Sequence, residues 1–252
     1  MIDLHSHILP GLDDGPETIE ESRQIARAAC ADGITTIAAT PHVRDDYPTR
    51  PEEMEEAVET LRRDFEAAAI RVEIVHGAEI AIERLPLLSR EELDRFSFAQ
   101  RGRYLLLECP FIGWPLALER VVSDLAAAGL TTLLAHPERN GEVKRDPALV
   151  EPLVRAGARL QLTAASLDGR FGQTTRATAE RLLELRLAHV VASDAHAPSL
   201  REGGLAQAAA ALADGGLARY LTEEAPAAIL AGELVPEPPV PPARRRRRLR
   251  LF

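Results

Sequence analysis

Cysteine is scarce in this chain of 252 residues, which contains only Cys30 and Cys109. Two cysteines do not make a disulfide framework, and neither belongs to a CxxC pair that would bind zinc or carry out thiol redox chemistry. We therefore expect both to be small buried apolar residues. The cysteine content excludes disulfide-stapled and zinc-thiolate folds.

Long apolar runs and nucleotide-binding motifs are also missing. No stretch approaches the roughly 18 uninterrupted apolar residues of a membrane span, and the start lacks a basic segment followed by an apolar core. We therefore expect a cytoplasmic protein. No GxGxxG or GxxxxGK[ST] motif follows any predicted strand, which removes the signatures of a nucleotide-binding open sheet.

Charge is distributed unevenly. The formal net charge is -9, yet residues 236–252 hold six arginines and one glutamate, which leaves an acidic body. A segment this rich in proline and then in like charge does not pack into a core. We expect one domain over residues 1–235 and a flexible tail over 236–252. The tail is either solvated without a partner, or it contacts anionic lipid, nucleic acid or the acidic body of the protein itself. Of these partners we favour an anionic surface at the inner face of the membrane, and we expect no dedicated nucleic-acid partner.

Short apolar runs alternate with helical patterns through most of the chain. Helices are predicted from Thr18, whose Thr-x-x-Glu pattern is a capping box, from Pro51, and over 115–129 and 176–186. Strands are predicted at the first residues and at 34–40, 71–77, 104–109, 131–136, 158–163 and 188–193. Alternation of this kind requires parallel pairing, in an open sheet or a closed α/β barrel.

Histidines and carboxylates follow these strands at their carboxyl ends. In a parallel barrel these ends share one face, where active sites are built. His5-x-His7 and Asp194-x-His196 each place both members on one side of a strand, because side chains alternate along it. So many charges would repel one another without cations, and a mixture of imidazole and carboxylate suits Mn²⁺, Fe or Zn²⁺. The candidate ligands are His5, His7, His42, Glu79, Glu108, His136, Asp194 and His196. His76 and His189 lie earlier in their strands, and we expect them to be structural.

The sequence resembles the PHP superfamily of metal-dependent phosphoesterases. The resemblance rests on DLHSHILPGLDDGP, TPHV, GAEI, LLLEC, AHPERN and ASDAH, and it covers roughly residues 1–233. Within the superfamily, the DDGP segment, HPER, QLTAASLDGRFG and the arginine-rich end are similar to the bacterial manganese-dependent protein tyrosine phosphatases of capsule and exopolysaccharide operons.

The resemblance implies a distorted seven-stranded barrel with three divalent metal ions, most readily Mn²⁺. One metal takes His5, His7, Glu79 and Asp194; a second shares Glu79 and adds Glu108 and His136; a third takes Asp14, His42 and His196. Asp13 is expected to contact these ligands and hold them in place without binding a metal itself. Arg139 and Arg201 are expected to bind phosphate, because a guanidinium matches phosphate oxygens bidentately.

The resemblance implies hydrolysis of phosphotyrosine, on a bacterial tyrosine kinase that regulates capsule or exopolysaccharide synthesis and export. A phenolate leaving group, with a pKa of about 10, departs without a dedicated general acid. A cysteine-dependent route needs arginine six positions after the thiolate, and positions 36 and 115 hold threonine and proline. Phe111 and Trp114 could contact the tyrosine ring or simply pack. The alternatives are a small-molecule phosphomonoesterase such as a histidinol-phosphate phosphatase, and a nonenzymatic docking protein that acts through its tail.

Overall fold

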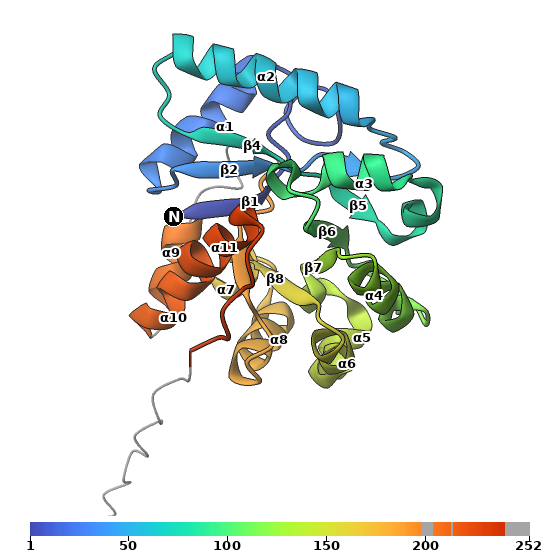
Figure 1. Cartoon of the computed structure of the whole chain (residues 1–252). Helices are drawn as coiled ribbons and strands as arrows, with labels where there is room; N and C mark the ends of the chain where they lie inside the picture. Colours follow the sequence, from blue (N-terminus) through green and yellow to red (C-terminus); the bar gives the residue numbers. More distant parts are fainter. Residues whose placement is uncertain (198–203, 213, 240–252) are drawn as a thin grey trace, which may run out of the picture.

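The computed structural model describes residues 1–197, 204–212 and 214–239. Parallel strands alternate with helices throughout this part of the chain (Figure 1). The strands are β1 (Ile2–Ser6), β2 (Thr36–Ala39), β3 (His42–Val43), β4 (Glu73–His76), β5 (Glu79–Ala81), β6 (Tyr104–Glu108), β7 (Thr131–Ala135), β8 (Arg159–Thr163) and β9 (Val190–Ala192). The expected α/β class with parallel pairing is confirmed.

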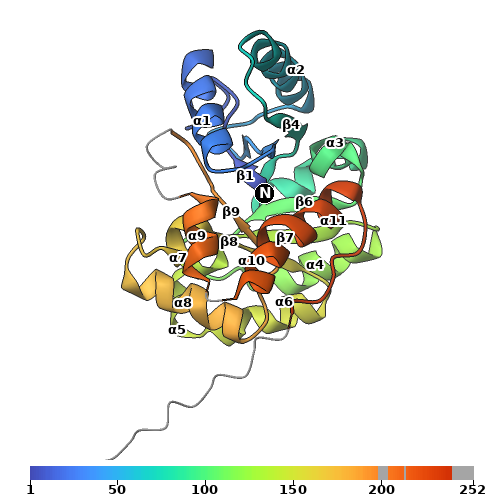
Figure 2. The same ribbon diagram turned by 90° about the vertical axis from the view of Figure 1, so that its left-hand side faces the viewer.

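The helices pack outside these strands. They are α1 (Ile19–Ala31), α2 (Pro51–Ala67), α3 (Arg90–Phe96), α4 (Leu118–Ala127), α5 (Gly141–Arg145), α6 (Glu151–Arg155), α7 (Ala164–Leu167), α8 (Gln173–Glu184), α9 (Leu205–Ala211), α10 (Gly215–Arg219) and α11 (Ala225–Ala231). Helices α1 and α2 lie over β1, β2 and β4, while α9 to α11 lie beside the N-terminus (Figures 1 and 2). The predicted capping box of α1 is present, with Thr18 accepting from the Glu21 N–H.

The sheet topology differs from the expected seven-stranded barrel. The described residues form nine strands in two sheets, with the orders β1-β2-β4 and β3-β5-β6-β7-β8-β9. The expected strands at 34–40 and 71–77 are shorter than predicted, and each is followed within a few residues by a second short strand. Pro41 lies between β2 and β3 and has no N–H to donate, so the ladder is interrupted there.

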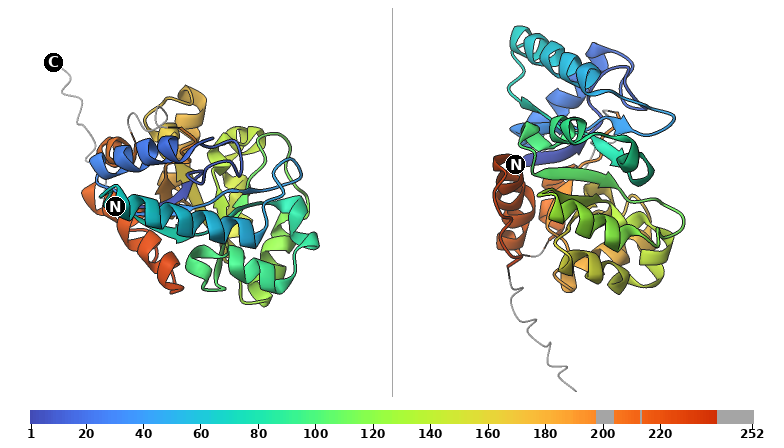
Figure 3. Two further views of the ribbon diagram at one scale, coloured as in Figure 1. Left: turned by 90° about the horizontal axis from the view of Figure 1, so that it is seen from above. Right: turned by 45° about the vertical axis from the view of Figure 1, so that its right-hand side comes forward.

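The two sheets meet where β1 runs beside β9. Ser6 and Ala195 form an isolated parallel bridge. The Asp194 N–H donates to the His5 carbonyl at 2.8 Å, and the His7 N–H donates to the Ala195 carbonyl at 2.9 Å. These bonds join residues nearly 190 positions apart in the chain, and they bring the ends of β1 and β9 to one place. Figure 3 shows the N-terminus, where β1 begins, beside the orange and red C-terminal helices.

Apolar residues fill the space between strands and helices. Leu105, Leu106 and Leu107 of β6 and Leu133 and Leu134 of β7 are all buried, because a parallel sheet covered by helices is apolar on both faces. No helix in the described ranges is long and apolar enough to span a bilayer.

Several expectations fall partly or wholly outside the described ranges. Arg201 and the arginines of the expected tail lie in the residues that the structure does not describe. The described part of the expected tail, residues 236–239, contacts the body: the Tyr220 hydroxyl donates to the Pro236 carbonyl at 2.7 Å, and Arg186 donates to the Pro238 carbonyl.

Candidate metal centre

Four buried side chains converge between the carboxyl ends of β1 and β9 and the first residue of β5. His5 Nε2 lies 3.2 Å from His7 Nε2, 3.2 Å from Glu79 Oε2 and 3.4 Å from Asp194 Oδ1. His7 Nε2 lies 3.3 Å from the same Glu79 oxygen and 3.6 Å from Asp194 Oδ1. Two imidazole nitrogens and two carboxylate oxygens therefore surround one point, and they come from the four residues that the family resemblance implies for one metal.

A second group lies nearer to solvent. Asp14 Oδ1 is 3.3 Å from His196 Nε2 and 3.5 Å from His42 Nε2. These three side chains and His7 could hold one metal ion between them. The family resemblance implies Asp14, His42 and His196 for one metal, and the structure brings His7 close to them.

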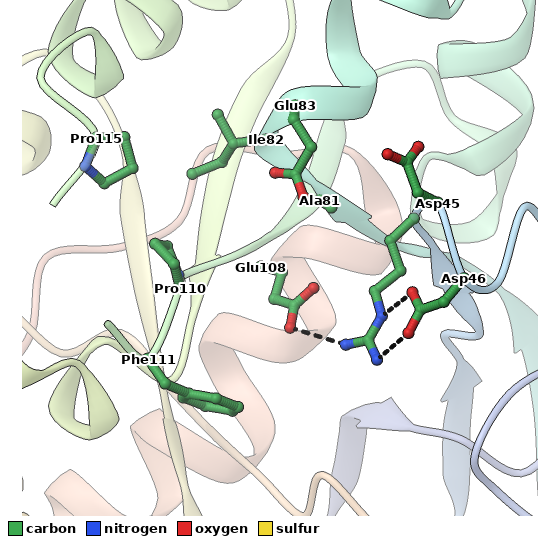
Figure 4. A pocket seen from close by; sticks show the side chains of 10 residues that line it. Asp45, Asp46, Ala81, Ile82, Glu83, Glu108, Pro110, Phe111 and Pro115 are labelled. Carbon is green, nitrogen blue, oxygen red and sulfur yellow. Dashed lines mark hydrogen bonds and ion pairs between the residues drawn. The ribbon is translucent and has the colours of Figure 1, made fainter. Parts of the chain in front are cut away.

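A third group forms around the other oxygen of Glu79. His136 Nε2 lies 2.9 Å from Glu79 Oε1, and His5 completes a possible metal-holding set with them. Glu108, which the sequence placed here, stands apart from the three sets: its Oε2 is 3.9 Å from His42 Nδ1, and its Oε1 accepts from Arg44 at 3.4 Å (Figure 4). Glu108 nevertheless lines the cavity at the cluster, and its Oε2 has no hydrogen bond with Arg44 in the structure.

Unusual backbone conformations bring two of these ligands into the cluster. His136 has φ 37° and Asp194 has φ 53°, a region that residues with side chains seldom adopt. Each follows the end of a strand, β7 or β9, and the turn aims its side chain back over the strand end. Strain of this kind persists where the surrounding structure enforces it and concentrates at functional sites.

A further layer of polar side chains orients the histidines. Asp13 Oδ2 lies 2.6 Å from His7 Nδ1 and accepts the His42 backbone N–H at 3.0 Å, while Asp13 Oδ1 accepts from Gly15. Gln161 Oε1 lies 2.9 Å from His5 Nδ1. Partners of this kind fix the ring orientation of a metal-binding histidine.

Gln161 and Arg44 are not among the site residues predicted from the sequence. Gln161 is a fully buried polar residue inside the apolar run of β8, and that contrast is the signal that could have singled it out. Arg44 lies two residues after His42 and lines the cavity of about 110 Å³ at the cluster together with Arg139. Its position in a surface loop gives no comparable signal.

When no cation is bound, protons on the histidines balance the negative charge of the buried carboxylates. Burial alone would lower the pKa of His5, but Glu79 and Asp194 outweigh it and raise that pKa to about 9. The pKa of His7 is also raised, against burial, by Asp13, Asp194 and Glu79. Burial would raise the pKa of Glu79, yet His5 and His136 hold it well below its usual range. The cluster therefore demands positive charge.

The donor set fits a divalent cation. Burial lowers the pKa of His42 to about 4, so its imidazole is neutral. Its Nδ1 atom is buried without a hydrogen-bond partner, 3.1 Å from Glu79 Oε2. An imidazole nitrogen without a hydrogen-bond partner and a nearby carboxylate oxygen can both bind a cation placed between them. Nitrogen and oxygen donors without thiolate suit Mn²⁺, Fe or Zn²⁺.

Arg139 is the described cation held closest to the cluster. Its Nη1 donates to Asp194 Oδ2 at 2.5 Å. The guanidinium carbon lies 4.4 Å from the centre of the Phe111 ring and 4.7 Å from that of Phe171. Two aromatic rings and a carboxylate therefore fix this guanidinium at the cavity.

Of the remaining candidates, Phe111 lines the cavity at the cluster, whereas Trp114, His189, His76 and Cys109 do not. Trp114 packs against the core, whereas Phe111 is 45% exposed. His189 Nδ1 accepts the Leu160 backbone N–H, and His76 is half-buried in β4. Burial raises the pKa of the Cys109 thiol, which removes it as a nucleophile.

Comparisons with known proteins agree with this geometry. Residues 1–229 match the family model for capsular polysaccharide synthesis, CpsB/CapC. The tyrosine-protein phosphatase YwqE of Bacillus subtilis (strain 168) is 40% identical over 199 residues, 78% of this chain and 77% of that protein. The tyrosine-protein phosphatase CpsB of Streptococcus pneumoniae is 31% identical over 204 residues, 78% of this chain and 83% of that protein.

A solved structure of this kind of phosphatase is also similar to this chain. It comes from crystal structures of YwqE from Bacillus subtilis and CpsB from Streptococcus pneumoniae, which are called unique metal-dependent tyrosine phosphatases. It matches this chain with a TM-score of 0.86 and 35% sequence identity, and the match covers 97% of this chain and 100% of the other.

The affinity of the cluster for Mn²⁺ should fall as the pH falls. Between pH 6 and 8 the metal-free protein holds protons on His5, whose pKa is about 9, and on His7, and a metal ion must displace them. Affinity should therefore rise about tenfold per pH unit for each displaced proton. Titration calorimetry in buffers of different protonation enthalpy measures both quantities. Equal affinity at pH 6 and pH 8 would contradict the prediction.

Replacing the neighbouring aspartates should separate their roles. Asp14→Asn removes a carboxylate that faces His42 and His196, so the number of bound metal ions should fall. Asp13→Asn removes only the support of His7, so the number should be kept while affinity weakens by about 10- to 100-fold. Metal analysis after dialysis against graded Mn²⁺ concentrations distinguishes the two. Identical metal content in both variants at every concentration would refute this assignment.

Proposed function

Because the chain belongs to the CpsB/CapC family of capsular polysaccharide synthesis, we propose that it is a metal-dependent tyrosine-protein phosphatase. It is a hydrolase that releases phosphate from phosphotyrosine in proteins. The observation that carries this function is the cluster around Glu79, which gathers histidines and carboxylates from both sheets beside Arg139.

The metal ligands are assigned from the clusters. We assign His5, His7, Glu79 and Asp194 to one ion, Glu79, His136 and Glu108 to a second, and Asp14, His42 and His196 to a third, with Mn²⁺ as the preferred ion. Bound divalent ions supply a lowered pKa for coordinated water and withdraw charge from the phosphoryl oxygens.

The protein's own residues bind and orient the substrate. A phosphate dianion is repelled by Glu79, Asp194 and Glu108, so cationic side chains must accompany it. Arg139 donates to Asp194 and keeps further N–H donors for phosphate oxygens, since a guanidinium carries five. Phe111 and Phe171 hold it in place, which lowers the entropy lost when phosphate binds. Arg201 is proposed as a second phosphate-binding residue from the sequence alone.

The leaving group favours an aryl ester. A phenolate, whose conjugate acid has a pKa of about 10, departs with less protonation than an alkoxide. The relatives compared above are named tyrosine-protein phosphatases, so the small-molecule alternative is not favoured. We propose a bacterial tyrosine kinase of capsule or exopolysaccharide synthesis as the protein substrate.

Phosphate release should depend on the metal and not on cysteine. With a phosphotyrosyl peptide, chelation should abolish turnover and added Mn²⁺ should restore it. The double variant Cys30→Ala/Cys109→Ala should keep its Mn²⁺-dependent turnover, because the Cys109 thiol is buried and protonated. Turnover that survives chelation, or a higher kcat/KM for histidinol phosphate than for the peptide, would reject the proposal.

Arg139 should matter for turnover more than for metal loading. Arg139→Lys keeps the charge but loses the planar fork that matches phosphate, so kcat should fall by about 100-fold while the metal content stays the same. Arg145→Lys is the matched control, because Arg145 is exposed on α5 and pairs only with Glu142 among the described residues. Equal kcat values for the two variants would remove Arg139 from the proposed site.

A further inference from the structure

Exposed apolar side chains gather beside the candidate metal centre. Among the described residues, six large apolar side chains are exposed, and five lie on three segments next to the cluster or the groove beside it. They are Leu87, Phe111, Ile112, Leu116 and Phe171. Ile112 is 92% exposed and Leu116 is 99% exposed, both in the loop that follows β6. A concentration of this kind marks a surface that binds another molecule.

A groove of about 540 Å³ runs from this loop toward the cluster. Ala81, Ile82, Pro110, Phe111 and Pro115 form its apolar side, and the loop after β3 forms its polar side (Figure 4). Arg44, Glu108 and Phe111 line both the groove and the smaller cavity at the cluster. A molecule whose phosphate enters the cavity therefore extends into the groove.

The charges of the groove disfavour an anionic occupant. Arg44 is held by Asp46 at 2.7 and 2.9 Å and also faces Glu108. Arg84 pairs with Asp45 at 2.9 Å. Glu83 has no ion pair within the described part of the chain. Arg44, which lines the groove, is thus neutralised, as is Arg84, which pairs with the groove residue Asp45. An anionic lipid or an acidic peptide finds no uncompensated cation among the described residues here.

We propose that the groove and the exposed loop 110–116 bind the polypeptide that flanks the phosphotyrosine, and that they select substrates with apolar side chains next to it. The proposal rests on the tyrosine-phosphatase function proposed above, and it adds the chemistry of the neighbouring residues. Burial of Ile112 and Leu116 against such a side chain makes binding of these substrates more favourable than binding of substrates with polar residues at the same place. A membrane surface or a second copy of the chain would use the same side chains but would leave the groove unfilled.

The test compares substrates that differ only beside the phosphotyrosine. Two phosphotyrosyl peptides, one with leucine and one with serine as the flanking residues, are assayed with Mn²⁺ together with p-nitrophenyl phosphate. The wild-type protein should prefer the leucine peptide by about tenfold in kcat/KM, mainly through KM, which corresponds to about 1.4 kcal/mol. The double variant Ile112→Ser/Leu116→Ser should bring the ratio of the two peptides close to one.

Leu234→Ser is the matched control, because Leu234 is an exposed leucine, 75% accessible, that lies outside the three segments. It should keep the wild-type preference. Equal kcat/KM for both peptides in the wild type would overturn the inference, as would a parallel loss on all three substrates in the double variant. The inference would also be overturned if the double variant kept the peptide preference but bound phosphatidylglycerol vesicles more weakly or changed its oligomeric state. If the wild type hydrolyses none of the three substrates, the proposed function itself fails.

Discussion

Glu79 is the side chain on which the site depends. It is 1% exposed, and its carboxylate lies within 3.3 Å of imidazole nitrogens from four histidines: His5, His7, His42 and His136. An unpaired buried carboxylate costs several kcal/mol, and removal of one partner from a buried ion pair costs about 3–5 kcal/mol. Protons or metal ions must therefore stay beside Glu79. The chain meets this demand by ending β1 and β7, and beginning β3 and β5, around one point.

The backbone departs from regular strand geometry at the places where it brings ligands close to Glu79. The ladder is interrupted at Pro41 so that His42 restarts as β3 opposite Glu79, with which it is paired in register. His136 and Asp194 adopt positive φ values directly after their strands. Asp13 ties the loop after β1 to both His7 and the His42 backbone. Irregularity is thus concentrated at the strand ends, while the buried leucines of β6 and β7 stay in an ordinary parallel ladder.

Polarity changes in order from the cluster to the surface. Buried imidazoles and carboxylates lie innermost, and Arg139 follows between Phe111 and Phe171. The groove with its apolar side and the exposed Ile112 and Leu116 lie outermost. This order matches a phosphorylated tyrosine in a polypeptide, which has a charged end, an aromatic ring and a main chain with neighbours. Phe111 contributes to both the cavity and the groove, so the loop after β6 connects catalysis with selection.

The sequence by itself determined the class of fold and most of the ligand types. Alternating strands and helices, and histidines and carboxylates at the strand ends, are local patterns, and the two-residue repeat of a strand already aligns His5 with His7. Tertiary structure decided the interruption of two strands, the support of His5 by Gln161, and the contact of Glu108 with Arg44. These features depend on distances between residues far apart in the chain. Such distances are set only when the strands pack, so no local pattern contains them.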